Sequence, residues 1–192
     1  MPPTRTSTQE ALLLSLAKAL SDQPRASMEQ LAAMAGISRA TLCRCFATRE
    51  AMLDALHEQA VRCAQGAFEQ ARVREGSAEQ ALRRLIDEWL PIAELYACID
   101  KQQGCPEKQG AAQALNAALT AQLQQWQQSG ELRMDLPASW LVESMLSLLR
   151  SAAAMIRNGE LARNDAARSV HATLCGGIGT RAAAGARPGK QP

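Results

Sequence analysis

Apolar residues recur every three or four positions along most of the chain, which is the spacing of one face of an α-helix. Leu12, Leu16 and Leu20 mark the first of these stripes, and Pro24 interrupts it because proline does not continue a helix easily. No segment shows the strict alternation of apolar and polar residues that is typical of a half-buried strand. The pattern therefore predicts an all-α protein with about nine helices.

Capping residues divide the region that follows into short helices. Ser27 has the spacing of a capping box and predicts the start of a helix that Gly36 ends. Ser38 is placed to cap a second short helix, and Thr48 is placed to cap a longer one. Two short helices joined by a tight turn indicate a helix-turn-helix motif over residues 27–46.

The second helix of this motif has two contrasting faces. Leu42 and Phe46 are four residues apart and share one face, whereas Ala40, Thr41 and Arg44 lie on the other. A short helix with one buried edge and a small, polar or basic outer edge fits the major groove of DNA. The candidate DNA-contacting residues are Ser27, Ser38, Arg39, Ala40, Thr41, Cys43, Arg44, Cys45 and Arg49.

The run LAAMAGISRATLCRCFATREAML, which begins at Leu31, resembles the TetR (TetR/AcrR) family of bacterial regulators. That family typically reads I-A-x-x-A-G-V-S-x-x-T-L-Y-x-x-F-x-x-K-x-x-L in this stretch, and the resemblance extends over about residues 7–60. Cys43 stands where the family commonly has a tyrosine that touches the DNA backbone. Arg49 replaces the usual lysine and keeps its charge.

The resemblance implies two domains. Residues 7–55 are expected to form a three-helix DNA-binding domain, and residues 56–178 a helical domain for effector binding and dimerisation. Residues 1–6 and the Ala-, Gly- and Pro-rich residues 179–192 are expected to be disordered.

The resemblance also implies a homodimer. The last two long helices, at about residues 138–157 and 165–174, would pair with those of a second copy as a four-helix bundle. The small residues at 151–154 and 166–167 would permit close approach between copies, although ordinary packing within one chain is the alternative. Two-fold symmetry would double the contacts that one short helix makes with a palindromic site.

The expected activity is that of a repressor that releases double-stranded operator DNA when a small effector binds. Few charges fall on the inner faces of the middle helices, so an apolar or aromatic effector is expected. The large or polarisable residues predicted to line its pocket are Phe68, Trp89, Tyr96, Trp126 and Met145.

Composition changes this picture little. The net charge is only +2, but four arginines stand against two glutamates between residues 24 and 50, which mildly favours a phosphate-facing surface.

No apolar run approaches the roughly 20 residues that cross a bilayer, and the first residues lack the features of a signal peptide. A cytoplasmic protein without a membrane partner is therefore expected.

The cysteines leave one alternative open. Cys43, Cys45, Cys63, Cys98, Cys105 and Cys175 are scattered, without the C-x-x-C spacing of a metal or redox motif. They are expected to be free thiols, and a regulator that senses oxidants or electrophiles through them is an alternative. A helical interaction module that does not bind DNA is a second alternative.

No enzyme is expected, because the sequence has no Gly-rich phosphate loop, no serine nucleophile elbow and no H-E-x-x-H motif. No cofactor is expected. No metal site is expected either, since neither His57 nor His171 has an evident set of further ligands.

Overall fold

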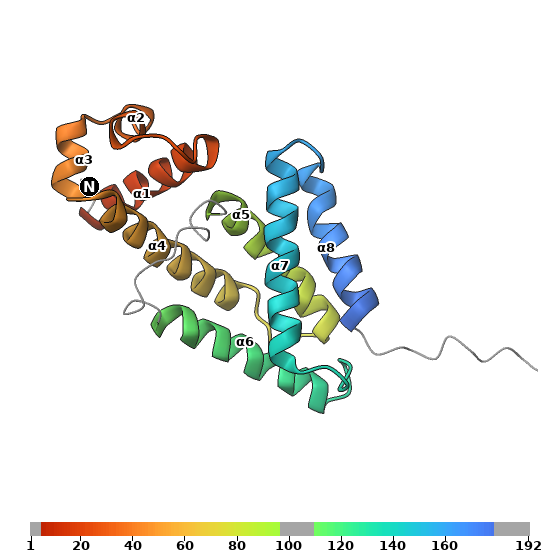
Figure 1. Cartoon of the computed structure of the whole chain (residues 1–192). Helices are drawn as coiled ribbons and strands as arrows, with labels where there is room; N and C mark the ends of the chain where they lie inside the picture. Colours follow the sequence, from red (N-terminus) through yellow and green to blue (C-terminus); the bar gives the residue numbers. More distant parts are fainter. Residues whose placement is uncertain (1–4, 97–109, 179–192) are drawn as a thin grey trace, which may run out of the picture.

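Helices make up most of the residues described in this computed structural model, which are 5–96 and 110–178 (Figure 1). The all-α prediction is confirmed, with eight helices and no strand in these ranges against the nine or so expected. The helices are α1 (Arg5–Asp22), α2 (Met28–Met34), α3 (Arg39–Cys45), α4 (Arg49–Gln70), α5 (Ala78–Tyr96), α6 (Gly110–Gln128), α7 (Ala138–Arg157) and α8 (Arg163–Ile178). None of them combines the length and apolar character that a bilayer-spanning helix needs.

The two chain ends that were expected to be disordered are only partly described. Residues 5 and 6 already belong to α1, so this helix begins earlier than predicted. Residues 1–4 and 179–192 lie outside the described ranges.

The short N-terminal helices begin at the residues that the sequence marks as caps. Ser27 Oγ accepts a hydrogen bond from the backbone N–H of Gln30, and Gln30 Oε1 accepts one from the N–H of Ser27, which completes a capping box. Ser38 and Thr48 each accept from the backbone N–H three residues on, at 3.1 Å. Local side-chain chemistry therefore sets where α2, α3 and α4 start.

Buried apolar side chains form two separate cores. The first comes from α1–α4 and the loop before α2, and includes the fully buried Leu16, Leu42 and Leu56. The second comes from α4–α8 and their connections, with Leu85 and Met145 fully buried in it. Figure 1 shows α1–α3 grouped at one end of the molecule and α4 running from them towards α6.

Two side chains of α5 bind the backbone of α4 and its C-terminal end. The guanidinium of Arg84 donates hydrogen bonds to the carbonyls of Ala71 (2.8 Å) and Arg72 (3.0 Å), just after α4 ends. Trp89 Nε1 donates to the carbonyl of Ala64, inside α4, at 3.0 Å. These contacts fix α5 against α4 along the second core.

Arg49, the first residue of α4, holds the loop that leads into α2. Its Nη1 donates to the carbonyl of Ala26 at 2.6 Å, and its Nη2 donates to the carbonyl of Pro24 at 3.2 Å. Ala26 is itself buried in the first core, directly before the cap of α2. Arg49 therefore sets how α2 sits relative to α4, a role that no local sequence pattern indicates. Its contact with DNA stays a prediction.

The charge of Arg49 is offset by its neighbour. The backbone N–H of Glu50 and the hydroxyl of Thr48 lower the pKa of the Glu50 carboxyl group, with a smaller contribution from Arg49. The carboxylate is therefore ionised at neutral pH, and it also complements the positive end of the α4 dipole. The start of α4 is consequently close to electrically neutral.

The role of Arg49 predicts a loss of stability on its removal. Arg49→Ala should lower the free energy of unfolding by about 1–3 kcal/mol, because the part-buried carbonyl of Ala26 and the exposed carbonyl of Pro24 lose a charged donor. Arg44→Ala removes the same charge from an exposed position on α3. This variant should change the free energy of unfolding by no more than about 0.5 kcal/mol. Urea unfolding followed by circular dichroism measures both. Equal stability of the two variants would show that Arg49 does not hold the loop.

Candidate nucleic-acid interface

The seven residues of α3 divide into a buried and an exposed side, as its sequence predicts. Leu42 is completely buried, and Phe46, which caps the C-terminus of α3, is 5% exposed. Thr41 is half-buried. The exposed residues of the helix are Arg39, Ala40, Cys43, Arg44 and Cys45. The two buried side chains anchor the helix to the first core, so its outer face is presented to solvent as a rigid surface.

The turn between α2 and α3 depends on Gly36. Its φ is +72°, a left-handed conformation that strains any residue with a side chain. The N–H of Gly36 donates to the carbonyl of Ala33, and the N–H of Ile37 donates to that of Ala32 at 3.0 Å. Ile37 also packs against the first core. The turn thereby fixes the angle at which α3 leaves α2.

Hydroxyl groups at the start of α3 are held in one arrangement. Ser38 Oγ and Thr41 Oγ1 lie 2.9 Å apart, within hydrogen-bonding distance. Ser38 Oγ also accepts from the backbone N–H of Thr41. The Thr41 hydroxyl is thus directed towards the cap, which leaves its methyl group as the free part of its side chain.

The exposed side of α3 is basic. Arg39 and Arg44 are the only charged residues of α3. Because they are five positions apart in the sequence, they lie about 140° apart around the helix axis. They therefore flank Ala40 on opposite edges of the exposed face. A helix with its side chains is roughly 10–12 Å across, and the major groove of B-DNA is about 12 Å wide. This face has the size and charge to enter that groove.

Both cysteines of α3 are exposed free thiols. Cys43 and Cys45 are two positions apart, so they point to different flanks of the helix. Cys63 and Cys175 are half-buried free thiols elsewhere in the chain. Cys98 and Cys105 lie outside the described residues.

A cavity of about 280 Å³ lies between α4, α5, α6 and α7. Its lining is mostly apolar, with His57, Asn116 and Arg150 as the polar exceptions. The residues that line it are His57, Ala60, Val61, Ala64, Trp89, Ile92, Ala93, Ala112, Leu115, Asn116, Leu119, Leu146, Leu149 and Arg150. The volume is close to the lower end of the range of about 300–1,000 Å³ that small-molecule sites occupy.

The cavity takes only part of its lining from the residues that the sequence analysis proposed. Trp89 lines it. Trp126 and Met145 are instead buried in the second core, and Phe68 packs against that core. The side chain of Tyr96 lies outside the described part of the structure. The lining combines Trp89 and several leucines with four alanines, so the identity of a large side chain alone does not show whether it lines the cavity.

The small residues that were expected to bring two copies together are partly used within one chain. Ala152, Ala153 and Ala166 are at most 5% exposed, and they are buried by packing within the chain itself. For these three alanines, packing within one chain is therefore the alternative that holds, in place of contact between two copies. Ser151 and Met155 remain exposed on the outer face of α7, and Trp140, near its start, is 61% exposed.

Proteins with similar sequences are transcriptional regulators. The helix-turn-helix regulator NfxB of Pseudomonas aeruginosa is 30% identical over 172 residues, which cover 87% of this chain and 92% of NfxB. The helix-turn-helix repressor LfrR of Mycolicibacterium smegmatis is 23% identical over 174 residues, covering 91% of this chain and 92% of LfrR. No protein-family model matches the chain.

Solved structures share the fold over nearly the whole chain. The TetR-like regulator LfrR in complex with proflavine aligns with a TM-score of 0.75 and 23% identity, over 89% of this chain and 96% of LfrR. The TetR-family regulator PfmR of Thermus thermophilus aligns with a TM-score of 0.69 and 21% identity, over 91% of this chain and 96% of PfmR. With its helix-turn-helix at residues 27–46 and this likeness in sequence and fold, the chain belongs to the TetR family of transcriptional regulators.

Proposed function

We propose that the protein is a dimeric repressor that binds a palindromic operator through α3. A small apolar or aromatic effector in the cavity between α4 and α7 would release it from the DNA. The observation that carries this proposal is the anchoring of α3 by Leu42 and Phe46, which leaves Arg39 and Arg44 exposed on either side of Ala40. The proposed role needs no catalytic step.

In this proposal each exposed residue of α3 and its flanks has a role. Arg39 or Arg44 donates two hydrogen bonds to a guanine in the major groove. The methyl group of Thr41 contacts a thymine methyl. Phosphates are contacted by the remaining candidates, which are Ser27, Ser38 and Arg49. Cys43 and Cys45, both exposed on α3, contact the DNA backbone in this proposal.

The division into two domains agrees with the two cores. Leu56 is the last fully buried residue of the first core, and Ala67 is the first buried residue of the second. We propose a DNA-binding domain of residues 7–55 and a helical domain of residues 56–178. The separation of the two cores supports this division, with α4 shared between the domains and Leu56 buried in the first core.

The dimer is proposed to form through the outer faces of α7 and α8. Trp140, Ser151 and Met155 lie along α7 with their side chains exposed, and this face has no covering from the described part of the chain. To bind both half-sites on one face of the DNA, the dimer must hold its two copies of α3 about 34–36 Å apart. That spacing corresponds to one turn of the double helix.

The effector class follows from the lining of the cavity. Eleven of the fourteen lining residues are apolar, and Trp89 offers an aromatic face for stacking. His57, Asn116 and Arg150 give a few polar contacts that would set the orientation of a ligand. LfrR, which shares the fold, has been solved with proflavine bound.

Release of DNA would pass through α4 and α5. Ala60 and Ile92 line the cavity and also pack against the first core. An effector that pushes these residues apart shifts the first core of each protomer, and with it the distance between the two α3 helices. Such coupling is typically worth about 1–3 kcal/mol.

A thiol-sensing regulator is the second candidate, and the exposure of Cys43 and Cys45 on α3 favours it. Modification of either thiol would place a new group on the face that enters the groove. In that case an oxidant or electrophile would release the DNA without using the cavity.

The DNA-binding role can be tested on genomic fragments selected with the purified protein. Arg44→Ala should weaken binding by about 1–3 kcal/mol and relax specificity at one base pair, because a bidentate contact with guanine is lost. Arg74→Ala removes the same charge from an exposed site beyond the far end of α4 and should bind like the parent. Gel shifts with point-mutated fragments measure both effects. Absence of sequence-selective binding by the parent would refute the proposed function, and parent-like binding by Arg44→Ala would show that α3 is wrongly assigned.

The dimer can be tested by placing a charge on the outer face of α7. Met155→Arg should convert the dimer into a monomer, since two guanidinium groups would meet near the two-fold axis, and operator affinity should fall at least about tenfold with the loss of one half-site. Gln113→Arg adds the same charge at an exposed position of α6 and should remain dimeric. Sedimentation equilibrium measures the oligomeric state. A Met155→Arg dimer would place the interface elsewhere.

A further inference from the structure

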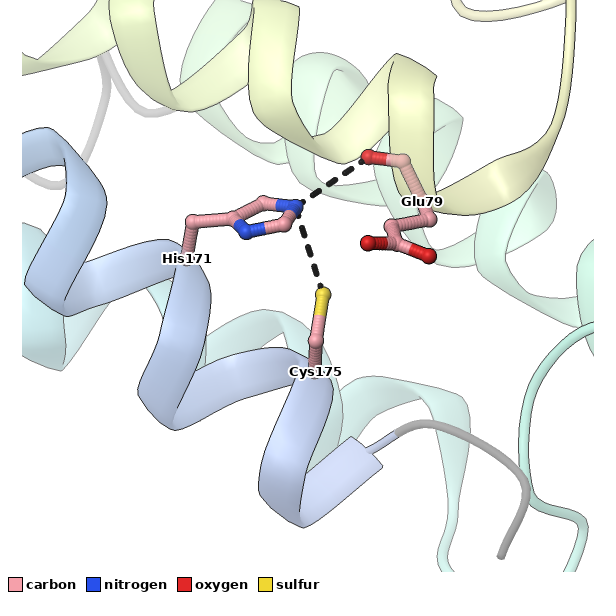
Figure 2. Close-up of side chains that lie close together, drawn as sticks. All are labelled: Glu79, His171 and Cys175. Atoms are coloured by element: carbon pink, nitrogen blue, oxygen red, sulfur yellow. Dashed lines mark hydrogen bonds between the residues drawn. The ribbon is translucent and has the colours of Figure 1, made fainter. Parts of the chain in front are cut away.

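Three side chains with metal-binding atoms meet where α5 begins and α8 ends (Figure 2). His171 and Cys175 lie one turn apart on α8, and Glu79 lies in the first turn of α5. His171 Nε2 is 3.3 Å from Cys175 Sγ and 3.4 Å from the carbonyl oxygen of Glu79. The imidazole nitrogen, the sulfur and a carboxylate oxygen all lie within 4.8 Å of one another.

These three donors are of the kinds that zinc prefers. Zn²⁺ takes nitrogen from His at about 2.0–2.1 Å, sulfur from Cys at about 2.3 Å and oxygen from Glu at about 2.0–2.2 Å, in a tetrahedron. Such bond lengths put a nitrogen and a sulfur ligand about 3.5 Å apart. The observed 3.3 Å between His171 and Cys175 already matches that separation. Glu79 is exposed, so its flexible carboxylate can close the remaining distance.

The surroundings hold the two donors of α8 in place. Val170 and Leu174, which precede His171 and Cys175, are 3% and 1% exposed in the second core. His171 and Cys175 are consequently half-buried on the side of α8 that faces α5, as Figure 2 shows. A ligand pair that is fixed by helix packing loses little conformational freedom when it binds an ion.

Metal binding requires the thiolate form of Cys175, so an ion at this site would displace the thiol proton and would lie between two anionic ligands, Cys175 and Glu79.

We propose that Glu79, His171 and Cys175 bind one divalent cation of the zinc class, with water as the remaining ligand. On binding, the Cys175 thiol releases its proton to solvent, and a metal–sulfur bond replaces a bond from the metal to water. The site is separate from the cavity, whose lining includes none of these residues. The ion would tie the start of α5 to the C-terminal half of α8.

The sequence alone did not reveal this site. His171 and Cys175 have the i, i+4 spacing of two ligands on one helix face, but two ligands do not make a site. The third donor is 92 residues away from His171, and only the packing of α5 on α8 brings it close.

Binding of Co²⁺ to the full-length protein tests the proposal. Zn²⁺ has a filled d shell and gives no visible spectrum, so Co²⁺ is the probe, and Zn²⁺ is then added to displace it. The protein is first treated with a chelator. One equivalent of Co²⁺ should produce a sulfur-to-cobalt charge-transfer band together with visible bands of a four-coordinate ion, and Zn²⁺ should abolish them.

Matched variants assign the ligands. Cys175→Ser should lose the charge-transfer band, whereas Cys63→Ser, which changes the other half-buried thiol described, should keep it. Glu79→Gln should weaken binding at least about tenfold, since even indirect partners of a metal ligand contribute that much. Glu88→Gln removes another exposed carboxylate of α5 and should bind like the parent.

Three results would overturn the proposal: no charge-transfer band in the parent, a band that survives in Cys175→Ser, or parent-like affinity in Glu79→Gln. Glu79 is exposed, so its variant keeps the test decisive if Cys175→Ser fails to fold. All three results are independent of whether the protein binds DNA.

Discussion

The continuity of α4 through two hydrophobic cores is the constraint on which the rest of the structure depends. Met52 and Leu56 are completely buried in the first core, and Ala67 is buried in the second. The helix has 22 residues, which gives it a length of about 33 Å at 1.5 Å per residue. In the proposed mechanism, a shift of the second core would move the start of α4, since a helix transmits displacement along its axis. Arg49 would pass that movement to the loop before α2, and the turn at Gly36 would pass it to α3.

This arrangement would let one chain read DNA and, as proposed, respond to a small molecule. The groove-sized face of α3 has no flexible connection to the helical domain, because Leu42 and Phe46 anchor it to the same core that holds α4. The cavity is bounded by the middle of α4, so an occupant contacts the helix that positions the DNA-binding domain. The cluster formed by Glu79, His171 and Cys175 lies on other helices, where an ion would stiffen the attachment of α8 to α5.

The features that could be predicted from the sequence are those that depend on nearby residues. The caps of α2, α3 and α4, the turn at Gly36 and the two faces of α3 each follow from side chains within a few positions. Features that depend on packing could not be predicted in the same way. Arg49 reaches carbonyls more than twenty positions away. The residues next to Ala152 in the sequence do not show that it is buried within one chain and not at a dimer face. In the same way, those next to Trp126 do not show that it fills the core and does not line a pocket.

Coupling between the cavity and the DNA-binding face of α3 is tested most directly by the operator affinity of a cavity-filled variant. Leu115 lines the cavity from α6 and does not belong to α4, so Leu115→Trp fills the space without altering that helix. With this coupling, Leu115→Trp should bind the operator about fivefold or more weakly than the parent. Ala118→Trp, which changes an exposed position of α6, should bind like the parent. Equal operator affinity for Leu115→Trp and the parent, with helical content unchanged, would contradict this coupling.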